Sequence, residues 1–312
     1  MRIVSLAGGI GGARFLRGLK AAAPDAEITV IGNTGDDITL FGLRICPDLD
    51  TVMYTLGGGI NEEQGWGRAD ETFTVKAELA AYGVEPQWFG LGDRDLATHI
   101  VRTQMLSAGY PLSQVTEALC TRWNPGVRLI PMTDDRVETH VVIEDEQGRR
   151  AIHFQEWWVR LRASVPAQRI VLVGADEAKP APGVLEAIDE ADVVILPPSN
   201  PVVSIGTILQ IRGIREALEP KPVVGVSPII GGAPVRGMAD ACLAAIGVPT
   251  TAQAVLELYG TPLINGWLVA EEDRDVALEG VRVVARPLLM TDLAAAADIA
   301  RAALRLAEEV AA

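Results

Sequence analysis

Four glycines lie near the start of the chain, in a stretch that joins a short apolar run to the expected start of a helix. They are Gly8, Gly9, Gly11 and Gly12. Glycine lets a backbone approach a ligand closely, and the free N–H groups at a helix start favour an anion, usually a phosphate. We expect residues 7–14 to form a phosphate-binding loop before a helix that opens at residues 15–19. The alternative is a tight turn in an α/β sheet.

Four carboxylates follow within fifteen residues of one another. They are Asp36, Asp37, Asp48 and Asp50. Carboxylates beside a phosphate would repel it unless a divalent cation lay between them, and Mg²⁺ is usually held by one or two carboxylates together with phosphate oxygens. We therefore expect at least one of the four to bind Mg²⁺. The alternative is that Asp36 and Asp37 form a turn and that Asp48 is the N-cap of a helix over residues 49–56.

The glycine pattern does not match the common nucleotide-binding fingerprints. The dinucleotide pattern needs a further glycine where Arg14 stands, and it needs an acidic residue at the end of the second strand, which this sequence lacks. No glycine is followed directly by Lys and then Ser or Thr, so the Walker pattern is missing too. An NAD-dependent oxidoreductase is therefore disfavoured, although it stays an alternative.

A third segment combines aromatic rings with charges ahead of an expected helix. Its residues are Trp88, Phe89, Asp93, Arg94 and Asp95. Aromatic faces stack on planar ring systems, and an arginine can bind phosphate or carboxylate, so we interpret the segment as a binding surface for a planar ligand. The alternative is core packing of the rings with Asp95 as the helix N-cap. His99 stands alone on that helix, where a histidine is more often structural than catalytic.

An alternation of strands and helices positions these segments. A strand over residues 27–32 lies about 24 residues after the first, the spacing of a right-handed βαβ unit. Further buried strands are expected at 170–174, 191–196 and 222–226, and a covering helix at 292–310. Ligands collect at the carboxyl edge of an open α/β sheet, so the loops that begin near residues 8, 33, 197 and 227 should form one cleft.

The pattern predicts a single Rossmann-like α/β domain over residues 1–312, with a mostly parallel sheet flanked by helices. The alternation stops between about residues 61 and 163, which indicates an inserted, mainly helical subdomain that includes a β-hairpin over 138–155. Two helices of this subdomain have the spacing of a helix-turn-helix. The second one carries too few basic residues to bind DNA.

The composition is that of an enzyme-sized soluble protein, with 312 residues of which 49% are hydrophobic. The net charge of −14 argues against binding to nucleic acid or to an anionic membrane. The cysteines Cys46, Cys120 and Cys242 are odd in number and far apart, as in proteins of a reducing compartment. We see no signal peptide and no apolar run of about 18 residues, and we expect a cytoplasmic protein.

Taken together, these motifs resemble the 2-phospho-L-lactate transferase family, CofD, over essentially the whole chain. The resemblance rests on residues 8–14, 33–37, 46–51, 54–56, 88–99, 198–201 and 204–206. It implies an enzyme of coenzyme F-420 biosynthesis that transfers a phosphate-linked three-carbon acid from a guanosine diphosphate carrier to the ribitol hydroxyl of the deazaflavin Fo, releasing GMP. It also implies a homodimer that acts on these small molecules.

Two donors are compatible with the family. The carried acid is phospholactate in archaeal members and phosphoenolpyruvate in the actinobacterial form, FbiA. Residues 44–47 and 153–158 look more like the actinobacterial form. Thr34 and residues 38–40 depart from the Trp-containing sequence of that form, so this departure concerns the subgroup and not the family.

The resemblance and the chemistry above together assign roles to residues. The diphosphate is expected at Gly8, Gly9, Gly11, Gly12 and Arg14. The guanosine part is expected at Ser199, Asn200, Ser204 and Gly206. The deazaflavin is expected at Asp50, Trp88, Phe89, Asp93 and Arg94. Mg²⁺ is expected at Asp36, Asp37 and Asp50.

Asp50 and Asp48 are the candidate catalytic residues, because either carboxylate could orient or deprotonate the acceptor hydroxyl. The exchange Asp50→Asn is expected to reduce turnover far more than it harms folding. A guanine-nucleotide-binding regulator remains a second alternative, since it would bind the nucleotide without consuming it. The transferase would release GMP only when Fo is present.

Overall fold

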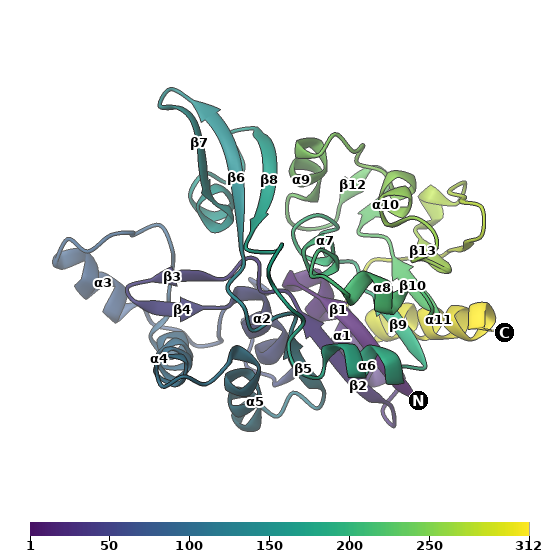
Figure 1. Cartoon of the computed structure of the whole chain (residues 1–312), viewed down its shortest axis with the longest axis horizontal. Coiled ribbons are helices and arrows are strands. Elements are labelled where there is room, and N and C mark those ends of the chain that lie inside the picture. The colour runs from purple at the N-terminus through teal and green to yellow at the C-terminus, as the bar shows by residue number, and fades with distance from the viewer. Residues whose placement is uncertain (312) are drawn as a thin grey trace.

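The computed structural model describes residues 1–311, and a seven-stranded parallel sheet forms its centre (Figure 1). The strand order is β14-β13-β10-β9-β1-β2-β5, and every neighbouring pair is parallel. The strands are β1 (Arg2–Ala7), β2 (Glu27–Gly32), β5 (Arg128–Pro131), β9 (Val193–Leu196), β10 (Val223–Val226), β13 (Gly266–Val269) and β14 (Arg282–Ala285). The predicted Rossmann-like α/β fold is confirmed.

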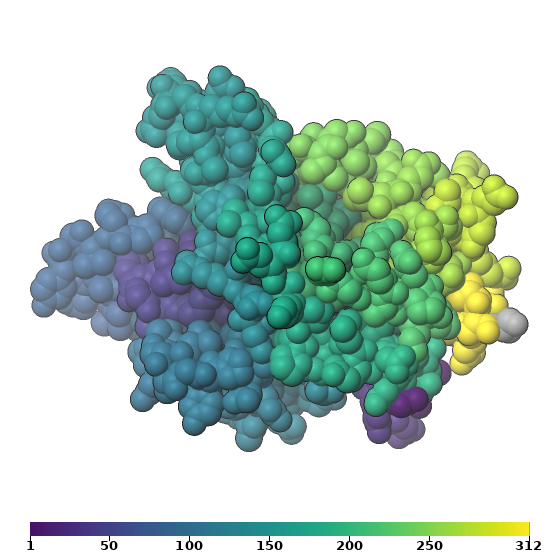
Figure 2. All heavy atoms as spheres, in the orientation of Figure 1, coloured from purple at the N-terminus to yellow at the C-terminus, as the bar shows by residue number. Residues whose placement is uncertain are grey.

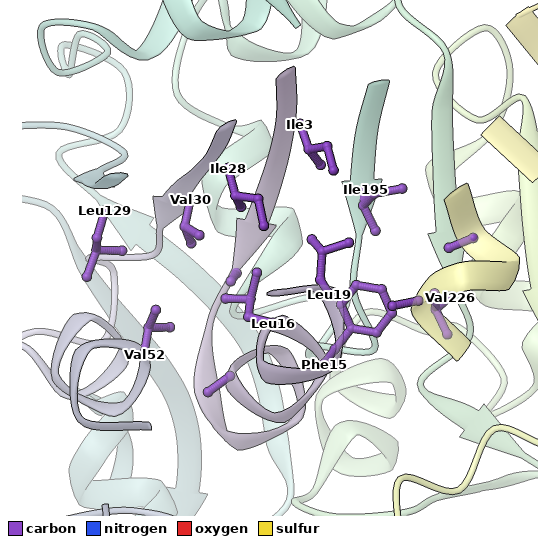
Figure 3. Packing of buried hydrophobic residues seen from close by; sticks show 14 of the residues in the cluster. Ile3, Phe15, Leu16, Leu19, Ile28, Val30, Val52, Leu129, Ile195 and Val226 are labelled. Atoms are coloured by element: carbon purple, nitrogen blue, oxygen red, sulfur yellow. The ribbon is translucent and has the colours of Figure 1, made fainter. Parts of the chain in front are cut away.

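Helices cover both faces of this sheet. One face is covered by α1 (Gly9–Ala22), α2 (Pro47–Leu56), α5 (Leu112–Trp123) and α11 (Leu293–Ala311). Figure 3 shows side chains of α1, among them Phe15 and Leu19, packed against the strand residues Ile3 and Ile195. The other face is covered by α6 (Val184–Glu190), α7 (Ile205–Leu209), α8 (Ile214–Leu218), α9 (Ala239–Ala245) and α10 (Ala252–Tyr259). Burial on both faces explains why the central strands are continuous apolar runs.

The remaining elements project from one end of the sheet. They are the strand pair β3 (Ile38–Leu40) and β4 (Leu43–Ile45), the helices α3 (Thr74–Ala81) and α4 (Asp93–Ser107), the strands β6 (Glu138–Asp145), β7 (Gly148–His153) and β8 (Ala167–Val173), and a π-helix over Glu156–Arg160. The strands β11 (Ile229–Ile230) and β12 (Ala233–Pro234) follow β10, and a 3₁₀-helix over Glu271–Asp273 follows β13. Figure 2 shows the α3 segment and the β6–β8 segment as two protruding lobes. None of the helices in residues 1–311 has the length and apolar character needed to cross a membrane.

One expected strand lies in a different sheet. The run at 170–174 falls in β8, which pairs antiparallel with β6 in the three-stranded sheet β7-β6-β8, so its placement in the main sheet was wrong. An apolar run of this length fits a half-covered strand as well as a buried one, and most of β8 is partly or fully exposed. The β6–β7 hairpin is confirmed, and β5, within residues 61–163, forms an edge of the main sheet.

The first helix begins earlier than expected. It starts at Gly9, so Gly11, Gly12 and Arg14 lie inside its first turns and not in a loop before it. A Cβ atom at Gly11 would overlap the carbonyl oxygen of Pro198, and one at Gly12 would overlap the hydroxyl of Ser199. These two glycines therefore serve the close packing of α1 against the loop after β9.

The two N-caps that the sequence offered as alternative interpretations are not present. Helix α2 starts at Pro47 with Cys46 as its N-cap, so Asp48 lies within the first turn. Helix α4 starts at Asp93 with Gly92 as its N-cap, so Asp95 is again inside the helix. Both aspartates are thereby free to bind groups outside their own helices.

The strand order places the loops after β1 and β9 side by side. Along the chain, β1 leads to β2 on one side, whereas β9 leads to β10 on the other. This reversal is a topological switch point, where open α/β sheets bind ligands outside the carboxyl ends of the strands. The fold therefore predicts the site beside Gly8 and Pro198.

We predict that Gly18→Ala destabilises the fold by about 1–3 kcal/mol, the usual cost of overpacking. A Cβ at Gly18 would overlap the backbone of Ala296, where α1 and α11 touch. The free energy of unfolding in urea measures the effect. Gly90→Ala is the control, because the nearest atoms to its Cβ lie 3.9 Å away. An unchanged midpoint for Gly18→Ala would contradict the tight contact between α1 and α11.

Candidate active site

A cleft with a volume of about 490 Å³ opens at the carboxyl edge of the sheet. Each of the four loops that the sequence pointed to contributes to its lining, through Gly8, Asp36, Pro198 and Ser227. The expected convergence of these loops is confirmed.

Asn33 links three of the segments around the cleft and is fully buried. Its Nδ2 group donates to Asp48 Oδ2 at 2.8 Å and to the carbonyl oxygen of Val203 at 3.0 Å. Its Oδ1 atom accepts the N–H of Gly35 at 2.9 Å. No individual role was predicted for Asn33, although an amide directly after a buried strand was a usable signal.

Asp48 joins the start of α2 to the start of α1. Its Oδ1 atom accepts the backbone N–H of Gly9 at 2.7 Å, so it takes one of the N–H groups that the first turn of α1 leaves free. Burial raises the pKa of Asp48 to about 6, although the hydrogen bonds from Asn33 and Gly9 act in the opposite direction. The carboxylate thus lies at the positive end of a helix and lines the cleft.

Asp36 faces the same part of the cleft with an unsatisfied oxygen. Its Oδ1 atom is buried and has no hydrogen-bond donor within residues 1–311. Burial raises the pKa of Asp36 well above its usual range, and the charges of Asp48 and Asp37 raise it further. Two buried carboxylates that repel each other, one with a free oxygen, fit a divalent cation between them.

Asp37 and Asp50 do not join that pair. Asp37 is fully buried, lies 3.3 Å from Arg44 Nη2 and does not line the cleft. Burial raises the pKa of Asp37 to about 7 despite the charge of Arg44. Residues 1–311 contain no group of three or more His, Cys, Asp or Glu side chains placed to hold a metal ion. The structure therefore brings together Asp36 and Asp48, and not the expected set of Asp36, Asp37 and Asp50.

Asp50 lines the cleft, but its negative charge is already paired with a positive charge of the protein. Its Oδ1 atom forms an ion pair with Arg102, a fully buried residue of α4. Burial raises the pKa of Asp50, while Arg102 and His99 lower it. Its second oxygen, Oδ2, is buried without a hydrogen-bond partner in the described residues.

The ion pair continues into a chain of polar side chains along α4. Nη1 of Arg102 lies 3.1 Å from Nδ1 of His99, and because a guanidinium only donates, Nδ1 must accept and Nε2 carries the proton. Nε2 of His99 lies 3.4 Å from Oδ2 of Asp95, whose Oδ1 atom accepts the hydroxyl of Tyr54 at 2.6 Å. Tyr54, Asp95 and His99 all line the cleft, so His99 belongs to the site wall.

Most of the residues that were expected to bind guanosine contact other parts of the protein. The Ser199 hydroxyl donates to the carbonyl oxygen of Gly8 at 2.8 Å, and Asn200 Oδ1 accepts the N–H groups of Val202 and Val203. Ser199, Asn200 and Ser204 line the cleft. Gly206 does not, and its missing side chain leaves room for the carbonyl of Pro201.

Only part of the aromatic segment lines the cleft, and its other residues contact other parts of the protein. Phe89 lines the cleft, whereas Trp88 packs with it edge to face against the β3–β4 hairpin. Asp93 accepts the N–H groups of Thr74 and Val75 at 3.0 Å and so caps α3. Its hydrogen bonds, with that of Thr72 the strongest, lower the pKa of Asp93 to about 2. Arg94 is exposed beside Asp70, and neither Asp93 nor Arg94 lines the cleft.

Other groups complete the lining without having been assigned to the site from the sequence. Trp66 and Trp158 add aromatic surface, and Arg236 adds a second guanidinium to that of Arg14. Arg236 lies in the loop after β12, behind the loop near residue 227 that was expected at the cleft. One cleft therefore combines a carboxylate pair, a helix N-terminus, two arginines and several aromatic rings.

Comparison with known proteins adds a family match and close relatives. The family model "2-phospho-L-lactate transferase CofD" matches residues 3–291. Proteins named phosphoenolpyruvate transferase from Thermobifida fusca and Streptomyces coelicolor are each 73% identical, over 99% of this chain and 99% of theirs. One of the same name from Mycobacterium sp. strain KMS is 60% identical, over 98% of this chain and 99% of its own.

A solved structure supports the fold. Protein BH3568 from Bacillus halodurans superposes with a TM-score of 0.64 at 18% sequence identity. The superposition covers 97% of this chain and 99% of that one. At this identity the likeness concerns the fold alone.

The geometry changes what is expected of Asp50→Asn. The exchange leaves Arg102 buried and unpaired, so we predict a loss of about 3–5 kcal/mol of folding free energy instead of an intact fold. Urea denaturation followed by circular dichroism measures the loss. The double variant Asp50→Leu with Arg102→Met should recover most of the stability, since an apolar pair replaces a buried ion pair at little cost.

The control for this prediction is Arg274→Gln, which removes an exposed ion pair with Glu271 and should change the stability by less than about 1 kcal/mol. If Asp50→Asn and Arg274→Gln unfolded at the same urea concentration as the wild type, the buried pair would contribute nothing and the prediction would be wrong.

Proposed function

Because the chain belongs to the 2-phospho-L-lactate transferase CofD family, a family of transferases, we propose that it transfers a phosphoenolpyruvyl group to the deazaflavin Fo. The donor is enolpyruvyl-diphospho-5′-guanosine. The ribitol hydroxyl of Fo forms the new P–O bond, the bridge between the two phosphates breaks, the hydroxyl proton is released, and GMP leaves. The product is dehydro coenzyme F-420-0. The choice of phosphoenolpyruvyl over phospholactyl is supported by the names of the relatives at 73% identity.

The observation that carries this proposal is the pair Asp36 and Asp48 at the N-terminus of α1, in one cleft with Arg14 and Arg236. Transfer of a substituted phosphate needs little covalent help from a protein, and depends on positioning and on offsetting negative charge. We propose that Asp36 and Asp48 hold Mg²⁺. When bound, the ion would neutralise charge on the phosphates of the donor and of the departing GMP.

The first turn of α1 supports a place for the diphosphate. The N–H of Gly9 donates a hydrogen bond to Asp48, whereas the N–H groups of Ile10 and Gly11 have no hydrogen-bond acceptor within residues 1–311. Together with the helix dipole these groups suit phosphate oxygens. We assign the guanosine part to the adjoining loop of Ser199 and Asn200, as the family resemblance implies.

We propose that the acceptor lies along the wall formed by Phe89, Tyr54 and His99. Phe89 offers an aromatic face to the deazaflavin ring. Asp50 is the residue proposed to orient the ribitol hydroxyl, because its ion pair with Arg102 fixes the carboxylate at the cleft. Asp48 is assigned to the metal instead, because it lies next to Asp36 and at the start of α1.

Mass spectrometry of a mixture of the protein, Mg²⁺, Fo and enolpyruvyl-diphospho-5′-guanosine tests the proposal. We expect dehydro coenzyme F-420-0 and GMP in equal amounts, and neither when Fo is left out. A control with lactyl-diphospho-5′-guanosine compares the two donors. Binding of the nucleotide with no GMP formed in the complete mixture would instead favour a regulator that does not turn over its ligand.

The carboxylate pair also predicts how stability depends on pH. The pKa values of Asp36 and Asp48 are raised in the folded protein, so between about pH 4 and pH 7 the folded state binds more protons than the unfolded state. Without metal, the melting temperature should therefore fall as the pH rises through this range. Mg²⁺ should raise the melting temperature more at pH 8 than at pH 5, since it binds the ionised carboxylates.

Thermal melts of Asp36→Asn check the assignment. In EDTA at pH 8 we expect this variant to melt above the wild type, because a buried charge beside Asp48 is gone, and we expect it to lose the Mg²⁺ shift. Asp145→Asn, which removes a partly exposed carboxylate paired with Arg150 outside the cleft, should keep the shift. A full Mg²⁺ shift in Asp36→Asn would rule out Asp36 as a ligand.

A further inference from the structure

Two arginines at the cleft have no carboxylate partner. Arg14 and Arg236 both line the cleft, and no carboxylate oxygen of residues 1–311 lies within 4 Å of either guanidinium. The next arginine along α1, Arg17, is paired with Glu62 at 2.8 Å. Burial lowers the pKa of Arg14, and the nearby charge of Arg236 lowers it further, whereas the charge of Glu62 raises it. In a chain with a net charge of −14, two neighbouring cations without a direct ion pair in the described residues indicate that an anionic ligand belongs there.

Arg236 lies beside the face of α1 that carries Arg14. Ile10, Arg14 and Arg17 are four and three residues apart, the spacing that places side chains along one side of a helix. The space left by the missing side chain of Gly65 is bounded by Ile10 and Arg236, since a Cβ there would lie 3.0 Å from Ile10 Cγ2 and 3.1 Å from Arg236 Nη1. The Arg236 guanidinium is therefore beside the first turn of α1, about one turn from Arg14.

The loop over residues 61–67 holds Arg236 in this place. Nη1 of Arg236 donates to the carbonyl oxygen of Gln64 at 3.1 Å, and Glu62 of the same loop is tied to α1 through Arg17. Asn61 closes the loop, because its Oδ1 atom accepts the N–H groups of Glu63 and Gln64 at 3.1 Å. Most of the N–H donors of Arg236 remain for a ligand.

The proposed donor carries one anionic group that the rest of the cleft does not match. In the proposed arrangement its two phosphates would face the N-terminus of α1 and the Mg²⁺ that Asp36 and Asp48 would hold. The carboxylate of the three-carbon acid still needs a partner. A guanidinium presents two parallel N–H groups that match the two oxygens of a carboxylate, which a single ammonium group does not.

We propose that Arg14 and Arg236 form a binding subsite for the carboxylate of the acid carried by the donor. The identity of that acid rests on the proposed function. The pair makes the cleft selective for the complete donor over GDP, which has the same guanosine and diphosphate but no carboxylate. Enolpyruvyl and lactyl donors both carry the group, so the subsite accepts either.

Isothermal titration calorimetry of the full chain with Mg²⁺ tests this subsite without turnover. The probes are lactyl-diphospho-5′-guanosine and GDP. We expect Arg236→Gln to weaken binding of the lactyl compound by about 10- to 100-fold, the value of one or two charge-assisted hydrogen bonds, and binding of GDP by less than about threefold. Arg14→Gln should act in the same sense. Arg236→Lys should weaken binding of the lactyl compound to an intermediate extent, because lysine keeps the positive charge but lacks the two parallel N–H groups of a guanidinium.

Arg212→Gln is the matched control, since it removes the same charge from an exposed turn outside the cleft. Equal weakening of both compounds would show that the arginines bind phosphate, and unchanged binding of both would show that they bind neither; each result overturns the subsite. So would a wild-type protein that binds the lactyl compound no more tightly than GDP. Failure of the proposed function would look different, namely selective binding of the lactyl compound but no GMP formed with Fo.

Discussion

The side chain of Asn33 makes the hydrogen bonds on which the geometry of the cleft depends. One fully buried amide binds the carboxylate of Asp48, the carbonyl of Val203 and the N–H of Gly35. Asp48 in turn binds the N–H of Gly9, so four segments far apart in the sequence are joined through two side chains. Each of these polar groups would be costly to leave unpaired inside the protein. The network therefore fixes where α1 begins relative to Asp36 and to the loop after β9.

Much of the fold and the location of the site could be predicted from the sequence. Strands buried on both faces are apolar throughout, and parallel strands bring their carboxyl ends to one edge, which was enough to place the cleft. The start of α1 could not be predicted, because the glycines that resemble a loop are needed for contacts with Pro198 and Ser199, which lie far along the chain. The sheet that β8 joins could not be predicted either, because it is decided by the partner strand β6 and not by the residues of β8 itself.

The aspartates near the cleft were evident in the sequence, but the role of each one could not be predicted from it. Asp36 and Asp37 are neighbours in sequence, yet one lines the cleft and the other is buried beside Arg44. Asp95, His99 and Arg102 were a usable signal, since spacings of four and three residues place all three on one face of α4. What the sequence did not reveal is that this face meets Asp50, because that contact joins residues of two helices that are 52 positions apart in the chain.

The packing of α1 near both of its ends has a consequence for the stability of the cleft. The helix is held against the loop after β9 near one end, through Gly11 and Gly12, and against α11 near the other, through Gly18. Phe15, Leu16 and Leu19 of α1 share a hydrophobic cluster with Ile299 and Ala303 of α11 (Figure 3). Without α11, that apolar face of α1 would be uncovered. Helix α11 contributes no residue to the lining of the cleft, so the position of the helix whose first turn borders the cleft depends on an element that does not line it.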